Sequence, residues 1–243
     1  MGKLDGKVAI VTGGSKGIGK GIAKAALAEG AHVVIAARDA EALGAAATEL
    51  GADDKVAAAP TDVTDEIEVA SLFDLAVKRF GRVDILVNNA GAFNGGPLDE
   101  LDVADWDHVV AVNLRGPFLC TREAIRWMKK QGDGGRILNI GSISAQRVRP
   151  NSGPYSTTKH GLWGLTQVTA LEGRDHGISC GCLHPGNTYV ERRQESGKGT
   201  DDEPMMSVDE LAEVALTMLT APKHMSVLEA IAIPIEQKYV GRG

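Results

Sequence analysis

The stretch "VAIVTGGSKGIGKGIAKAAL" (8–27) decides the fold. An apolar run typical of a buried strand leads into Gly13, Gly17 and Gly19, and a pattern of helical period follows. Glycines at this G-x-x-x-G-x-G spacing allow a tight turn, and they let backbone N–H groups approach a phosphate at the positive end of the helix dipole. A purely structural turn would also use three glycines, but the strand and the helix around them favour a dinucleotide-binding loop.

The same alternation of apolar runs and amphipathic stretches continues along the chain. It predicts strands at 7–13, 31–38, 55–63, 83–91, 135–142, 177–186 and 227–234. It predicts helices near 17–29, 40–50, 65–80, 105–130, 153–175 and 207–220. Because most of these strands are continuous apolar runs, we expect the α/β class, with a mostly parallel seven-stranded sheet covered by helices on both faces. The chain is therefore predicted to form a single doubly wound Rossmann domain over residues 1–243.

One segment, "NTYVERRQESGKGTDDEPMM" (187–206), interrupts this rhythm with polar and charged residues. Insertions at the carboxyl edge of such a sheet often close over a ligand, so we predict a substrate lid at 187–206. A plain surface loop with a short helix explains the same composition equally well.

Composition narrows the class of protein. The 243 residues carry a net charge of −6 and contain no long basic run, so no nucleic-acid partner is expected. Cys180 and Cys182 lie two apart on a predicted strand, and we expect buried, reduced thiols there rather than a metal site. No apolar stretch reaches membrane-spanning length and no secretory signal is present, which predicts a cytoplasmic protein without a membrane partner.

The end of the second predicted strand, "IAARDAEAL" (35–43), indicates which nicotinamide cofactor fits. A carboxylate at this point would bind the adenosine ribose hydroxyl, whereas a basic residue accommodates a 2′-phosphate. The strand ends with Ala37 and Arg38, and Lys16 lies in the glycine loop, so NADP is favoured while NAD stays possible. Asp39 could weaken this preference, but we expect it to turn into the next helix as its N-cap.

A second motif, "GPYSTTKHG" (153–161), places Tyr155 and Lys159 one helical turn apart, where they share a face. Taken alone, such a pair is more typical of a solvated helix face. Other motifs follow in a fixed order: "NNAG" (88–91), "VAVNLRGPF" (110–118), "NIGSIS" (139–144) and "HPG" (184–186).

With these motifs, and over nearly its whole length, the chain resembles the short-chain dehydrogenase/reductase family. The resemblance implies a catalytic tetrad of Asn113, Ser142, Tyr155 and Lys159. It also implies that Asp62 contacts the adenine of the cofactor. The full set of implied cofactor contacts is Gly13, Ser15, Lys16, Gly17, Ile18, Gly19, Arg38, Asp62, Val63, Asn88, Asn89, Ala90, Gly91, Tyr155, Lys159, Pro185, Gly186 and Thr188.

The chemistry of carbonyl reduction needs these residue types. Hydride transfer develops negative charge on the carbonyl oxygen, which must be stabilised and protonated. A free phenol ionises only near pH ~10, and the ammonium of Lys159 together with a positive nicotinamide ring would favour its phenolate form. Ser142 can hydrogen-bond the substrate oxygen. Asn113 either bends its helix or holds a water molecule, and the resemblance implies that this water carries protons to Lys159. His160 and His184 lie next to the site residues in the sequence, but we assign neither of them a role.

The sequence therefore predicts an NADP(H)-dependent oxidoreductase that moves hydride between nicotinamide and a secondary alcohol or ketone. A 3-oxoacyl-[acyl-carrier-protein] reductase is one alternative, because Arg122, Arg126, Lys129 and Lys130 could receive an acidic carrier. Basic residues late in a helix also complement its dipole, and His176 stands where carrier-binding reductases often have Arg.

A non-catalytic NADP-binding regulator is a third alternative, since fold does not dictate function. The resemblance further implies a homotetramer or homodimer formed through the helices near 105–130 and 153–175. The chain departs from many relatives at Val190, where they have a Thr that touches the nicotinamide, and we expect Thr188 to take over that contact.

Overall fold

The computed structural model describes residues 2–51, 54–190 and 204–239. Within them, seven strands form one sheet in the order β3-β2-β1-β4-β5-β6-β7. Each neighbouring pair is parallel, so the predicted fold class is confirmed. The strands are β1 (Val8–Thr12), β2 (His32–Ala37), β3 (Val56–Pro60), β4 (Ile85–Asn88), β5 (Gly135–Ile140), β6 (Ile178–Pro185) and β7 (Glu229–Ala232).

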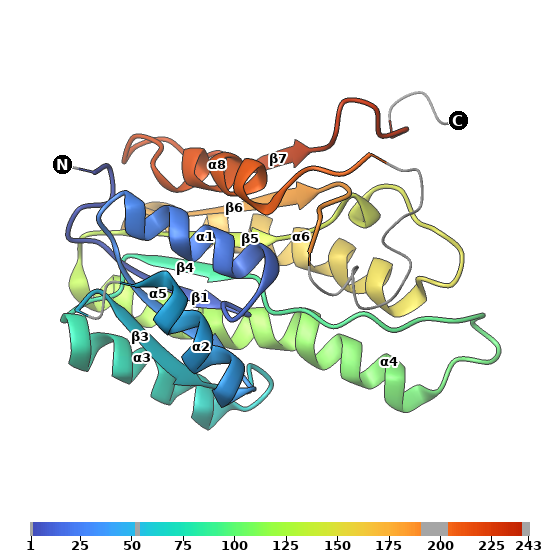
Figure 1. Cartoon of the computed structure of the whole chain (residues 1–243), viewed down its shortest axis with the longest axis horizontal. Helices are drawn as coiled ribbons and strands as arrows, with labels where there is room; N and C mark the ends of the chain where they lie inside the picture. Colours follow the sequence, from blue (N-terminus) through green and yellow to red (C-terminus); the bar gives the residue numbers. More distant parts are fainter. Residues whose placement is uncertain (1, 52–53, 191–203, 240–243) are drawn as a thin grey trace.

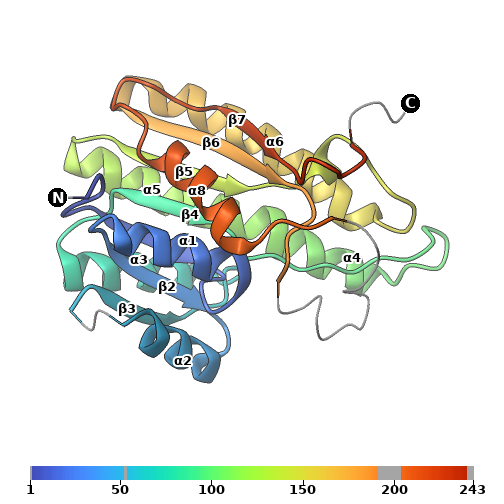
Figure 2. The ribbon, with the colours of Figure 1, turned by 45° about the horizontal axis from the view of Figure 1, so that its top comes forward.

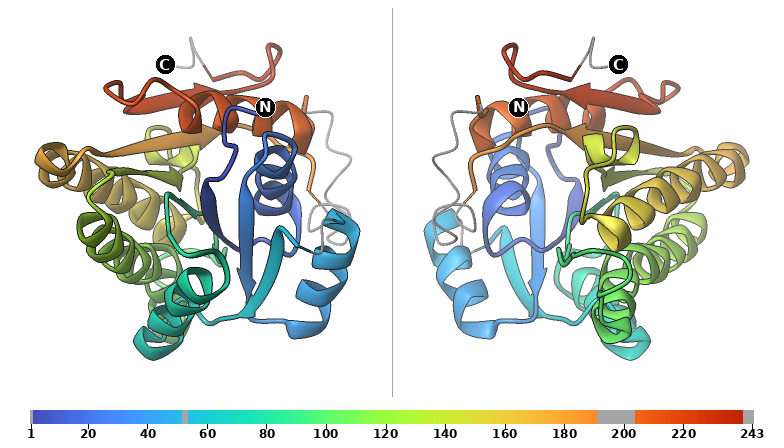
Figure 3. Two further views of the ribbon diagram at one scale, coloured as in Figure 1. Left: turned by 90° about the vertical axis from the view of Figure 1, so that its left-hand side faces the viewer. Right: turned by 90° about the vertical axis from the view of Figure 1, so that its right-hand side faces the viewer.

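Helices cover both faces of this sheet, as Figure 3 shows from its two ends. They are α1 (Gly17–Ala28), α2 (Ala40–Leu50), α3 (Glu66–Phe80), α4 (Val103–Val110), α5 (Gly116–Gln131), α6 (Gly153–Gly173) and α8 (Val208–Leu219). Apolar residues of α1, α2 and α8 pack in one core cluster, and those of α3 and α5 pack in a second cluster across the sheet.

The strands β1 to β6 supply both clusters, because successive side chains point to opposite faces. In β1, Ala9 and Val11 join the first cluster while Ile10 joins the second. All five residues of β1 are buried. This burial on both faces is the physical reason that the strands read as continuous apolar runs in the sequence.

The order of the sheet reverses between β1 and β4, which are neighbours although two strands lie between them in the chain. The loops that follow these two strands therefore open side by side at the carboxyl edge, where ligands bind in open α/β sheets. In Figures 1 and 2 this edge faces α4 and the first turns of α6. The predicted strands 55–63 and 83–91 end earlier, at Pro60 and Asn88, because the residues beyond them turn away into these loops.

The predicted helix 105–130 is interrupted. A π-helical turn, Ala111–Arg115, joins α4 to α5, and Asn113 lies in it. Single π turns of this kind often occur at functional sites. The irregularity that Asn113 suggested in the sequence is therefore present.

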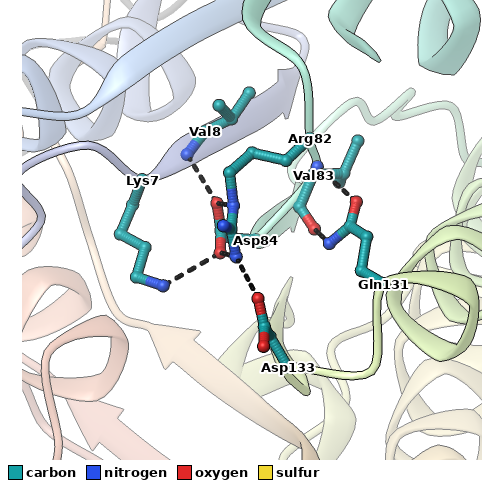
Figure 4. A network of polar contacts seen from close by, with 7 residues as sticks. All are labelled: Lys7, Val8, Arg82, Val83, Asp84, Gln131 and Asp133. Carbon is teal, nitrogen blue, oxygen red and sulfur yellow. Dashed lines mark hydrogen bonds and ion pairs between the residues drawn. The ribbon is translucent and has the colours of Figure 1, made fainter.

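The opposite, amino edge of the sheet holds a network of ion pairs (Figure 4). The Asp84 carboxylate accepts hydrogen bonds from Lys7 Nζ at 3.0 Å, from the Val8 backbone N–H at 3.0 Å and from Arg82 Nε at 2.7 Å. Arg82 also pairs with Asp133 at 3.1 Å. Burial alone would raise the pKa of Asp84, but these donors hold it below its usual value.

The predicted lid 187–206 lies mostly outside the described residues. Its two ends are joined, since the Tyr189 N–H donates to Met206 O at 2.9 Å and the Met206 N–H donates to Asn187 O at 3.0 Å.

Cys180 and Cys182 are buried free thiols, as predicted, and burial raises the pKa of Cys182 to about 12. Among the described helices, none is long and apolar enough to span a membrane.

Candidate active site

The predicted cofactor contacts outside α6 all lie at the carboxyl edge, at or after the ends of β1, β2, β3, β4 and β6. Thr12 ties two of these loops together. Its Oγ1 accepts hydrogen bonds from the backbone N–H groups of Asn89 at 3.0 Å and Ala90 at 3.1 Å. The Asn89 side chain donates in return to Thr12 O at 2.9 Å and Gly13 O at 3.1 Å. The "TGG" and "NNAG" motifs thus form one hydrogen-bonded unit.

The glycine loop is shaped for close backbone approach. Gly13 and Gly17 adopt φ of 63° and 53°, which a side chain disfavours. A Cβ at Gly19 would stand 2.4 Å from Asn89 Nδ2. Ser15 is half-buried in the loop, while Ile18 packs against the first core cluster and so anchors the start of α1.

The N-terminus of α1 differs from that of several other helices. No side chain caps it and its first turn has no acidic residue. By contrast, α2, α3, α4 and α8 are capped by an Asp or a Ser. The N–H groups at a helix N-terminus lie at the positive end of the helix dipole, so a first turn without an acidic residue fits the pyrophosphate of a dinucleotide.

The two cations that are predicted to lie at the adenosine side, Lys16 and Arg38, are both exposed. Asp39 accepts hydrogen bonds from the N–H groups of Glu41 and Ala42, so it caps α2 as predicted. Asp62 accepts from the Thr64 N–H and hydroxyl, both at 2.8 Å. Partial burial opposes ionisation of Asp62, but these hydrogen bonds outweigh it and lower its pKa.

Asn88 is placed differently from the prediction that it lines the adenosine side. Its side chain is buried and donates to Thr121 Oγ1 at 3.1 Å and Asn139 Oδ1 at 2.9 Å. It therefore fastens β4 to β5 and α5 in the interior, because a buried amide needs such partners. Among its neighbours, Ala90 is half-buried and Gly91 is exposed at the loop.

The Tyr155 and Lys159 side chains lie on the same face of α6, beside the end of β5. Lys159 is buried, and its Nζ donates to Ile140 O at 2.7 Å. The same Nζ lies 5.5 Å from the centre of the Tyr155 ring. The half-buried phenol also meets the Phe93 ring edge to face, with the centroids 5.2 Å apart. A backbone carbonyl of the sheet thus fixes the ammonium next to the phenol.

Ser142 follows β5 and is buried. Its Oγ accepts from the Ser144 N–H at 3.1 Å, which leaves the hydroxyl proton available as a donor. His184 approaches its backbone, with Nδ1 at 3.3 Å from Ser142 N and at 2.9 Å from Ser142 O. Burial lowers the pKa of His184 and so favours the neutral ring at neutral pH.

Asn113 is held by protein groups on both sides of its amide. Its Oδ1 accepts from the Ala92 N–H at 2.7 Å, and its Nδ2 donates to Ala92 O at 2.8 Å and to Thr158 Oγ1 at 3.3 Å. It therefore joins the π turn to the loop after β4 and to α6. The structure assigns it this anchoring contact, and the water path to Lys159 stays a prediction.

The "HPG" motif ends β6 and leads into the last predicted contacts. Pro185 is buried, and the Gly186 N–H donates to Ala232 O at 2.7 Å. The Thr188 hydroxyl donates to Gly186 O at 3.2 Å and is nearly buried. Val190 is half-buried nearby in the chain. That Thr188 contacts the nicotinamide stays a prediction.

Sequence reasoning missed three neighbours of the tetrad: Phe93, Thr158 and His184. Phe93 directly follows "NNAGA", and His184 opens "HPG", so both lay next to motifs already identified. His160, by contrast, is exposed, and its Nδ1 lies 2.8 Å from Ser156 O. Within residues 2–51, 54–190 and 204–239, no cluster of three His, Cys, Asp or Glu side chains could hold a metal.

Comparisons with known proteins agree on one family. The family model described as short chain dehydrogenase matches residues 7–201. An uncharacterized oxidoreductase from Bacillus subtilis (strain 168) is 38% identical over 227 residues, which is 92% of this chain and 87% of that protein. Another from Staphylococcus aureus (strain USA300) is 35% identical over 232 residues, 96% of this chain and 99% of that protein.

Solved structures give the same result. A 3-ketoacyl-(acyl-carrier-protein) reductase from Brucella melitensis, complexed with NADH, is 32% identical with a TM-score of 0.85, over 94% of this chain and 97% of that one. A putative gluconate dehydrogenase from Agrobacterium tumefaciens is 30% identical with a TM-score of 0.85, over 94% and 95%.

Proposed function

The chain belongs to the short-chain dehydrogenase/reductase family of oxidoreductases, and we propose that it transfers hydride between NADP(H) and a secondary alcohol or ketone. One observation carries this proposal. The Lys159 ammonium, fixed on Ile140 O, lies against the Tyr155 ring at the edge of the sheet that also carries the glycine loop. That edge is where a dinucleotide binds in doubly wound folds.

In this mechanism, Tyr155 moves the proton. A bound reduced nicotinamide supplies the hydride. The Tyr155 hydroxyl donates its proton to the carbonyl oxygen during reduction, and its phenolate takes the proton back when an alcohol is oxidised. Lys159 stabilises the phenolate, and its charge acts strongly because the ammonium is buried.

Ser142 orients the substrate in the same mechanism. Its hydroxyl proton is free to point at the substrate oxygen, since among the described residues its Oγ only accepts, from the Ser144 N–H. Such a donor stabilises the negative charge that develops on the oxygen. Asn113 keeps the loop after β4 in register with α6 through Ala92 and Thr158.

The preference for NADP rests on Lys16 and Arg38. Both are exposed, Arg38 directly after β2 and Lys16 in the glycine loop after β1, and Asp39 caps α2. Arginine and lysine bind a phosphate through charge-assisted hydrogen bonds. The solved relative from Brucella melitensis is complexed with NADH, so NAD stays an alternative cofactor for this chain.

Reduction of 3-oxoacyl thioesters is a second candidate, supported by the name of that same relative. The basic surface of α5 gives it little support, because Arg122 pairs with Glu66 at 2.6 Å and Arg126 pairs with Glu123 at 2.6 Å. Turnover of acetoacetyl-CoA would favour this candidate over simple alcohols and ketones.

We also propose a homodimer or homotetramer in the cytoplasm, built through α5 and α6. Phe118 on α5 and Val168 and Leu171 on α6 expose apolar side chains that a second copy could cover. Light scattering on the purified protein measures this directly; a monomer at micromolar concentration would contradict it.

The test of the proposed function is a panel of alcohols and ketones with NADP(H) and NAD(H), followed by absorbance of the reduced nicotinamide. We expect turnover with NADP(H), and Tyr155→Phe should lower kcat by roughly 10²–10⁴-fold because the proton donor is lost. NADPH binding by fluorescence and the melting temperature should stay unchanged, since the ring remains. Tight NADPH binding without turnover across the panel would instead support a regulator.

A further inference from the structure

His184 has the features of a residue that acts through a neighbour. It lies near the carboxyl end of β6, its side chain is completely buried, and the proposed mechanism does not use it. Its ring lies between the backbone of Ser142 and the carboxylate of Glu229, the first residue of β7. We propose that His184 is a positioning residue for Ser142 and that Glu229 sets which ring nitrogen carries the proton. This inference rests on the proposed function of Ser142.

The ring is fixed from several sides. A Cβ on Gly141 would stand 2.6 Å from His184 Nδ1, so the ring packs directly on the backbone that precedes Ser142. The Trp163 ring lies edge-on with its centroid 6.0 Å away. A side chain held this tightly transmits its position to the atoms that it hydrogen-bonds, because well-packed interiors have little free space.

Only one of the two contacts between Nδ1 and Ser142 can form at a time in a neutral ring. When Nε2 carries the proton, Nδ1 accepts from the Ser142 N–H; when Nδ1 carries it, Nδ1 donates to Ser142 O. These two states hold different backbone atoms of the residue whose hydroxyl orients the substrate. The position of one proton therefore affects how Ser142 is held.

Glu229 decides between the two states. Its Oε1 lies 3.4 Å from His184 Nε2, a buried nitrogen that forms no hydrogen bond within the described residues, so Glu229 acts on it through its charge. A carboxylate facing that nitrogen favours the Nε2–H form, as carboxylates fix the tautomer of histidines elsewhere. Glu229 is itself held by Gln146 Nε2 at 2.6 Å, on the segment between Ser142 and Tyr155.

Other charges also face the ring. Lys159 and His160 on α6 both act against a positive ring, and Glu229 on β7 acts for one. The thiol of Cys182 lies on the same strand and stays protonated at neutral pH, since burial raises its pKa to about 12. The ring is thus neutral at neutral pH, which is the condition under which the tautomer matters.

Two substitutions at His184 test the positioning role. His184→Asn keeps an amide near the place of Nδ1, whereas His184→Leu removes every polar contact at similar volume. We expect His184→Leu to lower kcat per folded molecule roughly 10–100-fold on the best substrate of the panel, with NADPH binding unchanged and whatever its effect on the melting temperature, and His184→Asn to recover most of the loss in kcat. A merely structural histidine would instead leave kcat per folded molecule intact.

A measurement independent of activity tests the tautomer. Nitrogen-15 NMR of the histidine rings, with His184 assigned by its substitution, should show the Nε2–H form in the natural protein. Glu229→Gln should shift the population toward Nδ1–H, because the new amide can donate to Nε2. Full kcat in His184→Leu, or the same tautomer with and without Glu229, overturns the inference. Loss of the proposed function would appear separately, as full activity in Tyr155→Phe.

Discussion

The two edges of the sheet use the same charged residue types in opposite ways. At the amino edge, Asp84 accepts from Lys7, Val8 and Arg82, so each charge has a partner within the chain (Figure 4). At the carboxyl edge, Lys16 and Arg38 are exposed and form no ion pair with another described residue. Charges that a protein neutralises itself serve stability, and exposed charges near a helix N-terminus that form no ion pair with another described residue are available to a ligand.

One lysine contact at each edge of the sheet sharpens this contrast: Lys159 is buried, whereas Lys7 is exposed. Lys159 donates to a backbone carbonyl beside the phenol, whereas Lys7 donates to a carboxylate at the far edge. We therefore expect Lys159 to act in catalysis and Lys7 to stabilise the fold.

The largest expected effect comes from Lys159→Met, which keeps the length of the side chain but removes its charge. We expect kcat to fall by roughly 10²–10⁴-fold, because the phenolate loses its stabilising cation. Lys7→Met is the matched control and should leave kcat within about two-fold. Steady-state kinetics on both variants measure this; equal losses in the two would remove the distinction between the edges.

The next effect is on stability. Asp84→Asn should lower the free energy of unfolding by about 1.5–3 kcal/mol, since hydrogen bonds to a charged group are worth that much. Urea unfolding measures it. The control is Asp133→Asn, whose exposed pair with Arg82 should contribute less than ~1 kcal/mol. Activity per folded molecule should not change, and a drop in kcat for Asp84→Asn would contradict a purely structural amino edge.

The same carboxylate gives a pH dependence of known sign. The pKa of Asp84 is lowered from 3.8 in the folded chain, so its contribution is fully present above the unfolded value. It is lost as the pH falls below about 4 and through the folded pKa. The difference in the free energy of unfolding between the natural protein and Asp84→Asn should therefore narrow as the pH falls from 6 to 3; a constant difference would show that the charge is not responsible.

Much of this arrangement could be predicted from local patterns. The glycine loop, the apolar runs and the pair Tyr155 and Lys159 all act through neighbours in sequence, so the fold class and the edge that carries the site followed from spacing. Strand ends were placed too late because apolar residues such as Val63 and Ala90 continue past the last ladder bond. The backbone turns out of the sheet at these points although the residues stay apolar, so the apolar pattern alone does not mark the end of the strand.

Long-range contacts between side chains and backbone could not be predicted. Asn113 meets Ala92 across 21 residues, and His184 meets Ser142 across 42. Neither pairing leaves a periodic signal, since each depends on how two loops pack at the sheet edge. Asn88 shows the same limit, because a motif places the residue but not the direction of its side chain.

The smallest expected effect tests the unpaired cations. Arg38→Ala should raise the KM for NADPH roughly five- to ten-fold, about 1–1.4 kcal/mol, and leave the KM for NADH unchanged, because the guanidinium would contact only the 2′-phosphate. Arg126→Ala is the control, since that arginine is exposed but already paired with Glu123. Initial rates with each cofactor measure both. An equal rise in KM for NADPH and NADH would mean that Arg38 does not contact the 2′-phosphate and has a structural role. The contrast between the two edges would then rest on Lys16 and Lys159 alone.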